Sequence, residues 1–194
     1  MNKFLLLLVT LVLSFLLSTN ASATTFRYIF GQKIISGNGP VTSNFAYLLF
    51  NDASKKFTLK SNSNLSVFGT GAFIGGLAID YSGAKVNVAG VTGGVNKIDV
   101  TNANGPTGVF DYRFKFGGGS DKLTKDESVS WLSSNYDIGK LGASKFALHV
   151  QGLSNGSSIW YAVSPVPESS TYLMMLAGLG LMGFVVSRRN QYQA

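Results

Sequence analysis

Two tryptophans and a single histidine are the side chains of this 194-residue chain best suited to bind or react with another molecule. Trp131 and Trp160 could stack on sugar rings, because an indole offers a flat apolar plate with a polar tip. His149 could act as a base only if a nucleophile and an orienting carboxylate lay beside it. A zinc site built from several histidines or cysteines is excluded, because the chain has one histidine and no cysteine. We therefore expect His149 to be a surface or half-buried strand residue.

The carboxylates of the central region are spread along the chain rather than paired. They are Asp52, Asp80, Asp99, Asp111, Asp121, Asp126, Glu127 and Asp137. A glycosidase needs two carboxyl groups that face each other across a cleft, about 5 to 9.5 Å apart. Only Asp126 and Glu127 are adjacent, and neighbouring residues of a strand point to opposite faces. The sequence therefore predicts that the chain is not an enzyme and that its aspartates serve mainly as turn residues.

One glycine-rich segment, residues 117–127, carries oxygen ligands of the kind that calcium prefers. It departs from the G-G-x-G-x-D calcium repeat, because Ser120 stands where that repeat has glycine and Asp121 falls one place early. Lys122 and Lys125 would also repel a cation. We expect no cofactor and a flexible connector here, and calcium bound by this segment is the alternative.

The elements that must position these residues are short strands. Apolar and polar residues alternate with a period of two, as where Tyr112, Phe114 and Phe116 follow Phe110 on one face of a half-buried strand. Glycine, asparagine and proline punctuate the intervals. The predicted strands cover residues 26–35, 41–50, 56–60, 65–68, 73–80, 85–91, 95–100, 110–116, 128–132, 145–151 and 159–163. The sequence predicts an all-β fold, an antiparallel β-sandwich or jelly-roll-like domain of about ten short strands.

The beginning of the chain has the pattern of a secretory signal peptide. Lys3 supplies a positive charge, residues 4–17 are almost wholly apolar, and Ala21 and Ala23 form the small-residue tripeptide that signal peptidase recognises. An apolar stretch of this length is shorter than the ~20 residues of a stable membrane-spanning helix. We expect residues 1–23 to direct export by the secretion machinery and to be removed, leaving residues 24–164 as the ectodomain.

The end of the chain has three consecutive parts. Val166, Pro167 and Glu168 come first, an uncharged apolar stretch follows, and Arg188 and Arg189 close it. We expect a transmembrane helix over residues 172–187 within a C-terminal unit of residues 165–194. Two arginines just beyond the helix favour a cytoplasmic end, which puts the ectodomain on the outer side of the membrane.

This tail resembles the PEP-CTERM sorting signal of Gram-negative bacteria. The motif, the apolar stretch and the basic end occur in the family's order, although Ser169 replaces the family's second proline. The resemblance implies recognition by an exosortase, an inner-membrane-anchored intermediate, and delivery to the cell envelope, cell surface or extracellular matrix. It also implies an association with exopolysaccharide and the biofilm matrix.

The charge of the chain is positive but dispersed. The formal net charge is +7, and no run of lysines and arginines in residues 24–164 is longer than two. Nucleic-acid binding would require a dense basic stripe, so we expect no nucleic-acid partner. We expect an exported protein with a structural or adhesive β-domain and no catalytic activity. The alternative is an exopolysaccharide-binding module that uses Trp131 or Trp160, with calcium in the 117–127 segment.

Overall fold

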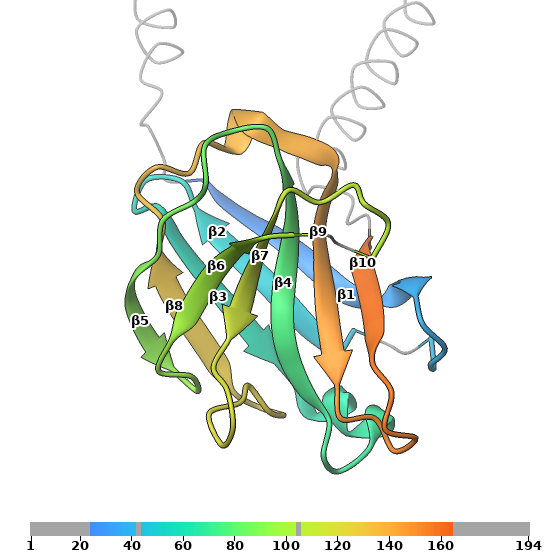
Figure 1. Cartoon of the computed structure of the whole chain (residues 1–194). Helices are drawn as coiled ribbons and strands as arrows, with labels where there is room; N and C mark the ends of the chain where they lie inside the picture. Colours follow the sequence, from blue (N-terminus) through green and yellow to red (C-terminus); the bar gives the residue numbers. More distant parts are fainter. Residues whose placement is uncertain (1–23, 42–43, 104–105, 165–194) are drawn as a thin grey trace, which may run out of the picture.

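Ten antiparallel strands and two short 3-10 helices make up the part of the chain that the computed structural model describes, residues 24–41, 44–103 and 106–164 (Figure 1). The strands are β1 (Thr25–Ser36), β2 (Ala46–Asn51), β3 (Lys56–Ser61), β4 (Phe73–Tyr81), β5 (Ala89–Gly93), β6 (Ile98–Asn102), β7 (Tyr112–Phe116), β8 (Ser128–Leu132), β9 (Leu141–Gln151) and β10 (Ile159–Ser164). The 3-10 helices are η1 (Ser63–Phe68) and η2 (Ile138–Lys140).

All ten strands belong to one sheet, in the order β5-β8-β3-β2-β1-β10-β9-β4-β7-β6, and every pairing is antiparallel. The two strands at the ends of this order, β5 and β6, are separated in the chain by residues 94–97 alone. The sheet therefore curls until its ends approach, and one half faces the other (Figure 1). The predicted all-β antiparallel fold of about ten strands is confirmed, as one continuous, nearly closed, barrel-like sheet.

Aromatic side chains fill the inside of the curled sheet. Phe57 on β3 stacks on Trp131 of β8, with ring centroids 5.2 Å apart and an interplanar angle of 10°. From the other half of the sheet, Phe114 and Phe146 approach Phe57 at 6.2 and 6.4 Å. Each such ring pair contributes about 0.5–1.5 kcal/mol beyond the burial of its area. The contacts across the interior explain why the two halves of one sheet pack together.

Several strand predictions needed correction. Residues 65–68 were predicted as a strand but lie in η1, where the Asn62 side chain accepts a hydrogen bond from Asn64 N at 2.9 Å and caps the turn. Leu65 and Phe68 are both buried. Their spacing of three suits a helical turn, which brings both onto one side. The strands predicted at 41–50 and 85–91 begin later, at the first residues of β2 and β5.

A β-bulge interrupts the pairing of β4 with β9. Ile74 pairs with Val150, but the next pair joins Gly76 to His149, so Gly75 is the extra residue. Both glycines face outward, because a Cβ built on Gly75 would meet the side chain of Gln151 and one built on Gly76 would meet Arg113. The bulge thus leaves a patch of the outer face without side chains of its own, and neighbouring side chains lie across it.

A second, smaller apolar cluster lies on the outer face. It joins Phe110 to Ala78 of β4 and Ala147 of β9, and Trp160 packs against it. The prediction that Phe110 shares the inward face of 112–116 is wrong, because β7 begins only at Tyr112. The preceding segment is fixed separately, since Asp111 N donates to Ile79 O at 3.0 Å.

The predicted signal peptide (residues 1–23), the sorting motif and the predicted transmembrane helix (172–187) lie outside the described residues. Among residues 24–41, 44–103 and 106–164, no helix has both the length and the apolar character needed to cross a bilayer.

Replacing Phe57 by alanine should lower the free energy of unfolding by about 3–5 kcal/mol, because the change opens a cavity among the stacked rings. Val67→Ala is the matched control, since Val67 is 58% exposed and should change stability by no more than about 0.5 kcal/mol. Urea denaturation followed by tryptophan fluorescence measures both values. Equal stability of the two variants would contradict the central place given to Phe57.

Candidate functional site

Most carboxylates of the described domain already have a hydrogen-bond or ion-pair partner within it. Five accept hydrogen bonds from backbone N–H groups, and these are Asp80 (from Ser144), Asp111 (Tyr81), Asp121 (Asn96), Glu127 (Thr124) and Asp137 (Gly139). Two others form ion pairs with lysines, in Asp52–Lys55 and Asp99–Lys97. Within the residues that the structure describes, no three or more of His, Asp and Glu gather as metal ligands. Asp137 and Glu127 bind amides two and three residues away, as turn residues do. The other three bind amides 25 to 64 residues away and tie separate segments together, which the turn prediction did not include.

The 117–127 segment is pinned to the sheet rather than forming a loose connector. Leu123 makes an isolated bridge with Ile74 at the start of β4, and Gly118 bridges Asp121. The Asp121 carboxylate accepts from Asn96 N at 3.0 and 3.1 Å, and Glu127 Oε2 accepts from Thr124 N at 2.6 Å. Both carboxylates thus already serve the fold. Calcium at this segment stays a prediction.

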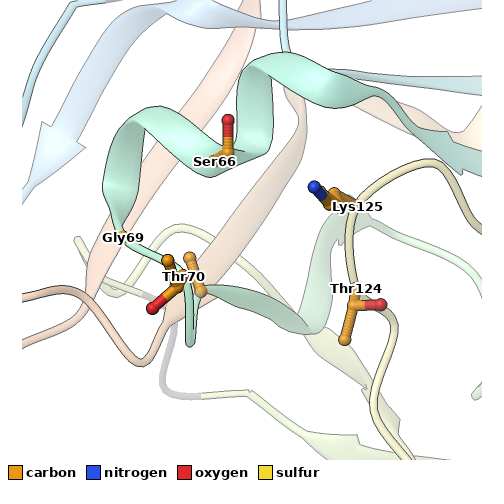
Figure 2. Close-up of a pocket in the computed structure, with 6 residues that line it drawn as sticks. Ser66, Gly69, Thr70, Thr124 and Lys125 are labelled. Atoms are coloured by element: carbon orange, nitrogen blue, oxygen red, sulfur yellow. The ribbon is translucent and has the colours of Figure 1, made fainter.

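A small hollow of about 250 Å³ opens between η1 and the 124–125 segment (Figure 2). Its lining consists of Ser66, Gly69, Thr70, Ala72, Thr124 and Lys125. Hydroxyl groups and one ammonium group can hydrogen-bond to a single polar group of a ligand. The volume lies below the ~300–1,000 Å³ usual for sites that enclose a small molecule, so this hollow is a secondary candidate.

The two tryptophans named as glycan contacts lie on opposite faces of the sheet. Trp131 is 0% exposed and stacks on Phe57 in the core, so no face of its indole can reach a sugar. The expectation for Trp131 is therefore wrong, because its position on β8 falls on the inward phase of the alternation. Trp160 is half-buried on the outer face, between the inward-facing Ile159 and Tyr161.

Trp160 forms a compact group with one residue of the adjacent strand β9 and one residue of the more distant strand β7. The His149 imidazole on β9 stacks on the indole with a centroid separation of 4.3 Å and an interplanar angle of 10°. Arg113 reaches across from β7, so that its Cζ lies 5.2 Å from the indole centroid. Its Nη2 donates a hydrogen bond of 2.9 Å to His149 Nδ1. Arg113, His149 and Trp160, together with Gln151, are called the outer platform below.

The bulge of β4 explains how these side chains lie flat on the sheet. A Cβ on Gly76 would come within 2.8 Å of Arg113 Nε, and a Cβ on Gly75 would overlap the Gln151 side chain. The two glycines therefore make room for long side chains that cross β4. Any other residue at either position would push Arg113 or Gln151 away from the sheet.

The electrostatics of the outer platform combine a neutral histidine with a charged arginine. Burial, and secondarily the charge of Arg113, lower the pKa of His149 to about 4, so the imidazole is neutral at pH 7. Arginine only donates, so His149 Nδ1 is the acceptor and its proton sits on Nε2. Burial also lowers the pKa of Arg113, whose Nε is buried without a hydrogen-bond partner.

The structure places His149 deeper than the sequence predicted, at 7% exposure. Arg113, Gln151 and the two glycines of the bulge were not predicted as site residues. Alternation around Phe114 does place Arg113 on the outer face. Nothing local in the sequence reveals that β4 lies between β7 and β9, and this pairing brings Arg113 to His149.

A PEP-CTERM protein-sorting motif matches residues 165–189. This match confirms the resemblance seen in the C-terminal residues. The motif indicates an exported protein that is sorted to the cell envelope and processed by an exosortase, a membrane enzyme. The match is confined to the C-terminal segment and describes none of the ten strands.

One solved structure is similar to this chain at 16% sequence identity. It is described as "pH-induced modulation of Streptococcus parasanguinis adhesion by Fap1 fimbriae". The alignment covers 77% of this chain and 98% of that chain, with a TM-score of 0.38. A similarity at this level carries no functional argument. No curated protein matches the chain at a significant level.

The free energy of unfolding should fall as the pH is lowered from about 6.5 towards about 4. The unfolded chain binds a proton on His149 near pH 6.5, whereas the folded protein resists protonation until about pH 4. Acid therefore favours the unfolded state across this window, and the contribution of His149 is constant above it. Urea denaturation at about pH 7.5 and about pH 5 measures the difference.

His149→Gln is the control, because glutamine can accept from Arg113 but does not titrate. All other ionisable groups are common to both proteins, so the comparison isolates His149. The glutamine variant should lose less stability between the two pH values than the wild type. An equal loss in both proteins would show that His149 does not cause the pH dependence.

Proposed function

We propose that this exported protein passes through an inner-membrane-anchored intermediate and is then delivered to the cell surface or extracellular matrix, where its β-barrel has a structural or adhesive role without catalysis. The sorting motif supports the delivery, and the engagement of the carboxylates supports the role. Seven carboxylates of the described domain already hold a backbone amide or a lysine. The observation that carries this proposal is that these acidic groups bind backbone amides and lysines within the domain itself.

Carbohydrate binding is the second candidate function, and the position of Trp160 favours it. The indole is half-buried on the outer face, beside a cation and an amide that lie flat on the sheet. Protein sites for sugars combine aromatic rings, which stack on C–H faces, with polar groups that bind hydroxyls. The ligand in this proposal is an exopolysaccharide, with calcium in the 117–127 segment as an accessory.

Replacing Glu168 by alanine should leave the chain unprocessed in the membrane fraction, because the exosortase would lose a charged recognition group of the motif. The mature protein should then be missing from the cell-surface and matrix fractions. Immunoblotting of these fractions from cells that contain the exosortase measures both effects. Ser170→Ala, next to the motif, is the matched control and should mature normally. Normal maturation of the Glu168 variant would contradict exosortase recognition of that residue.

Trp160→Ala should abolish binding of the full chain to any neutral or acidic polysaccharide that the wild type retains on a glycan array, because a sugar would lose its stacking partner. Tyr47→Ala is the matched control, since Tyr47 is a half-buried aromatic residue elsewhere on the outer face, under Arg27. The array is run with and without a calcium chelator. Absence of wild-type binding in both conditions would remove the carbohydrate-binding candidate and leave the structural role.

A further inference from the structure

We propose that the outer platform binds a saccharide that carries a carboxylate, with the carboxylate paired to Arg113 and the sugar ring placed against Trp160. This inference rests on the carbohydrate-binding candidate above and names its ligand class. It concerns the outer face of β7, β4, β9 and β10, where side chains from three strands meet over the two glycines of the bulge.

Arg113 is a partly buried cation that lacks a carboxylate partner. The ion pairs in the described part of the chain are Asp52–Lys55 and Asp99–Lys97, and neither involves Arg113. Its hydrogen bond to His149 uses one of five N–H donors, and Nε faces the sheet without a partner. The three other N–H groups have no hydrogen-bond partner among the described residues, and the planar fork of a guanidinium matches a carboxylate.

The guanidinium is already positioned for such a ligand. Gly76 lets the Arg113 side chain lie across β4, because a Cβ there would come within 2.8 Å of Nε. Arg113 Nη2 donates a hydrogen bond of 2.9 Å to His149 Nδ1, which fixes the guanidinium. The imidazole is neutral at pH 7 and adds no competing charge. A donor fixed before binding loses little conformational freedom when the ligand arrives, and this favours affinity.

Trp160 and Gln151 favour a saccharide over a simple organic acid, because a saccharide can use the indole and the carboxamide as well as the cation. A uronic acid has a carboxylate on the same ring that presents apolar C–H groups, so one residue can meet a cation and an indole together. The Gln151 side chain lies over Gly75 and makes no hydrogen bond to other described residues. Its carboxamide can donate to and accept from sugar hydroxyls.

The charge around the outer platform favours an anion. Lys115 pairs with Gly76 in the sheet and is exposed on the outer face. Lys122 lies with its Nζ 4.5 Å from the Phe73 ring, and Phe73 pairs with Gln151. The acidic groups nearby are Asp80 on β4 and Asp111 just before β7, Asp121, and Asp99 on β6. The first three bind backbone amides and Asp99 is paired with Lys97, whereas Lys115 and Lys122 form no ion pair with a described residue. Complementary charge of this kind promotes encounter with an acidic chain.

The test compares two probes with the same sugar skeleton, a galacturonic acid trisaccharide and its methyl ester, in which esterification removes the negative charges. The full chain, solubilised in detergent, is titrated with each probe by calorimetry. The acid should bind about tenfold more tightly or better, since a hydrogen-bonded charge pair contributes that much to affinity. Equal affinities would overturn the carboxylate assignment and leave a site for neutral sugars. Absence of binding by both probes would overturn this inference. The proposed sorting is tested separately, by the maturation of the Glu168→Ala variant.

Arg113→Gln should remove the preference for the acid, whereas Arg27→Gln should keep it. The control deletes the same charge from another arginine of the outer face, which lies over Tyr47 with Cζ 4.6 Å from the ring. Thermal denaturation checks that both variants fold. If both lose the preference equally, general attraction by the basic surface explains the binding and the site is refuted.

A measurement on the wild type covers the case in which Arg113→Gln fails to fold. The chain has two tryptophans, one in the core and one in the outer platform, so the indole N–H region of an NMR spectrum has two signals. The acid trisaccharide should shift the Trp160 signal and leave the Trp131 signal in place. A shift of neither signal at saturation would place the ligand elsewhere and overturn the inference.

An acidic peptide with the same net charge as the trisaccharide is a further control. It should bind at least about tenfold more weakly, and tighter binding of that peptide would assign the site to a protein partner instead.

Discussion

Packing of aromatic rings between the two halves of one sheet is the interaction on which the whole domain depends. A ten-stranded sheet that stayed open would expose the rings of Phe57, Trp131 and Phe146 to water. Curling buries them against each other, and the chain needs no disulfide to hold that shape, because it contains no cysteine. The cost is geometric: strands that curl tightly need bulges, and the bulge between β4 and β9 is one of them.

That bulge links the core to the surface. Leu77 of β4 and Leu148 of β9 are paired, and both side chains point into the core. The bulge just before them turns Gly75 and Gly76 outward. The resulting gap in the outer layer is filled by side chains that come from β7 and β9. The outer platform is therefore a by-product of how the sheet closes, and its flatness follows from the absence of a Cβ at two successive positions.

Local alternation was sufficient to predict strands with a clear inside and outside, such as 128–132 and 159–163, although it began the strand at 110 whereas β7 begins at Tyr112. It failed where a cap competed with it, because the Asn62 side chain turns the following residues into a 3-10 helix. It did not separate the two tryptophans, since both were named as sugar contacts and Trp131 is buried in the core. Alternation defines two faces without saying which one meets the core, and the meeting of Arg113 with His149 depends on strand order, which period-two patterns do not contain.

The position of β10 in the sheet has a mechanical consequence. This strand ends at Ser164, next in sequence to the sorting motif, and it is hydrogen-bonded to β1 on one side and to β9 on the other. Tension applied beyond Ser164 would enter the sheet through a central strand, where two ladders share the load, and not through the end strands β5 and β6. Trp160 lies on the same strand, so a pull between this side chain and the C-terminal end would pass along β10, whose Ile159 and Tyr161 side chains are anchored in the core.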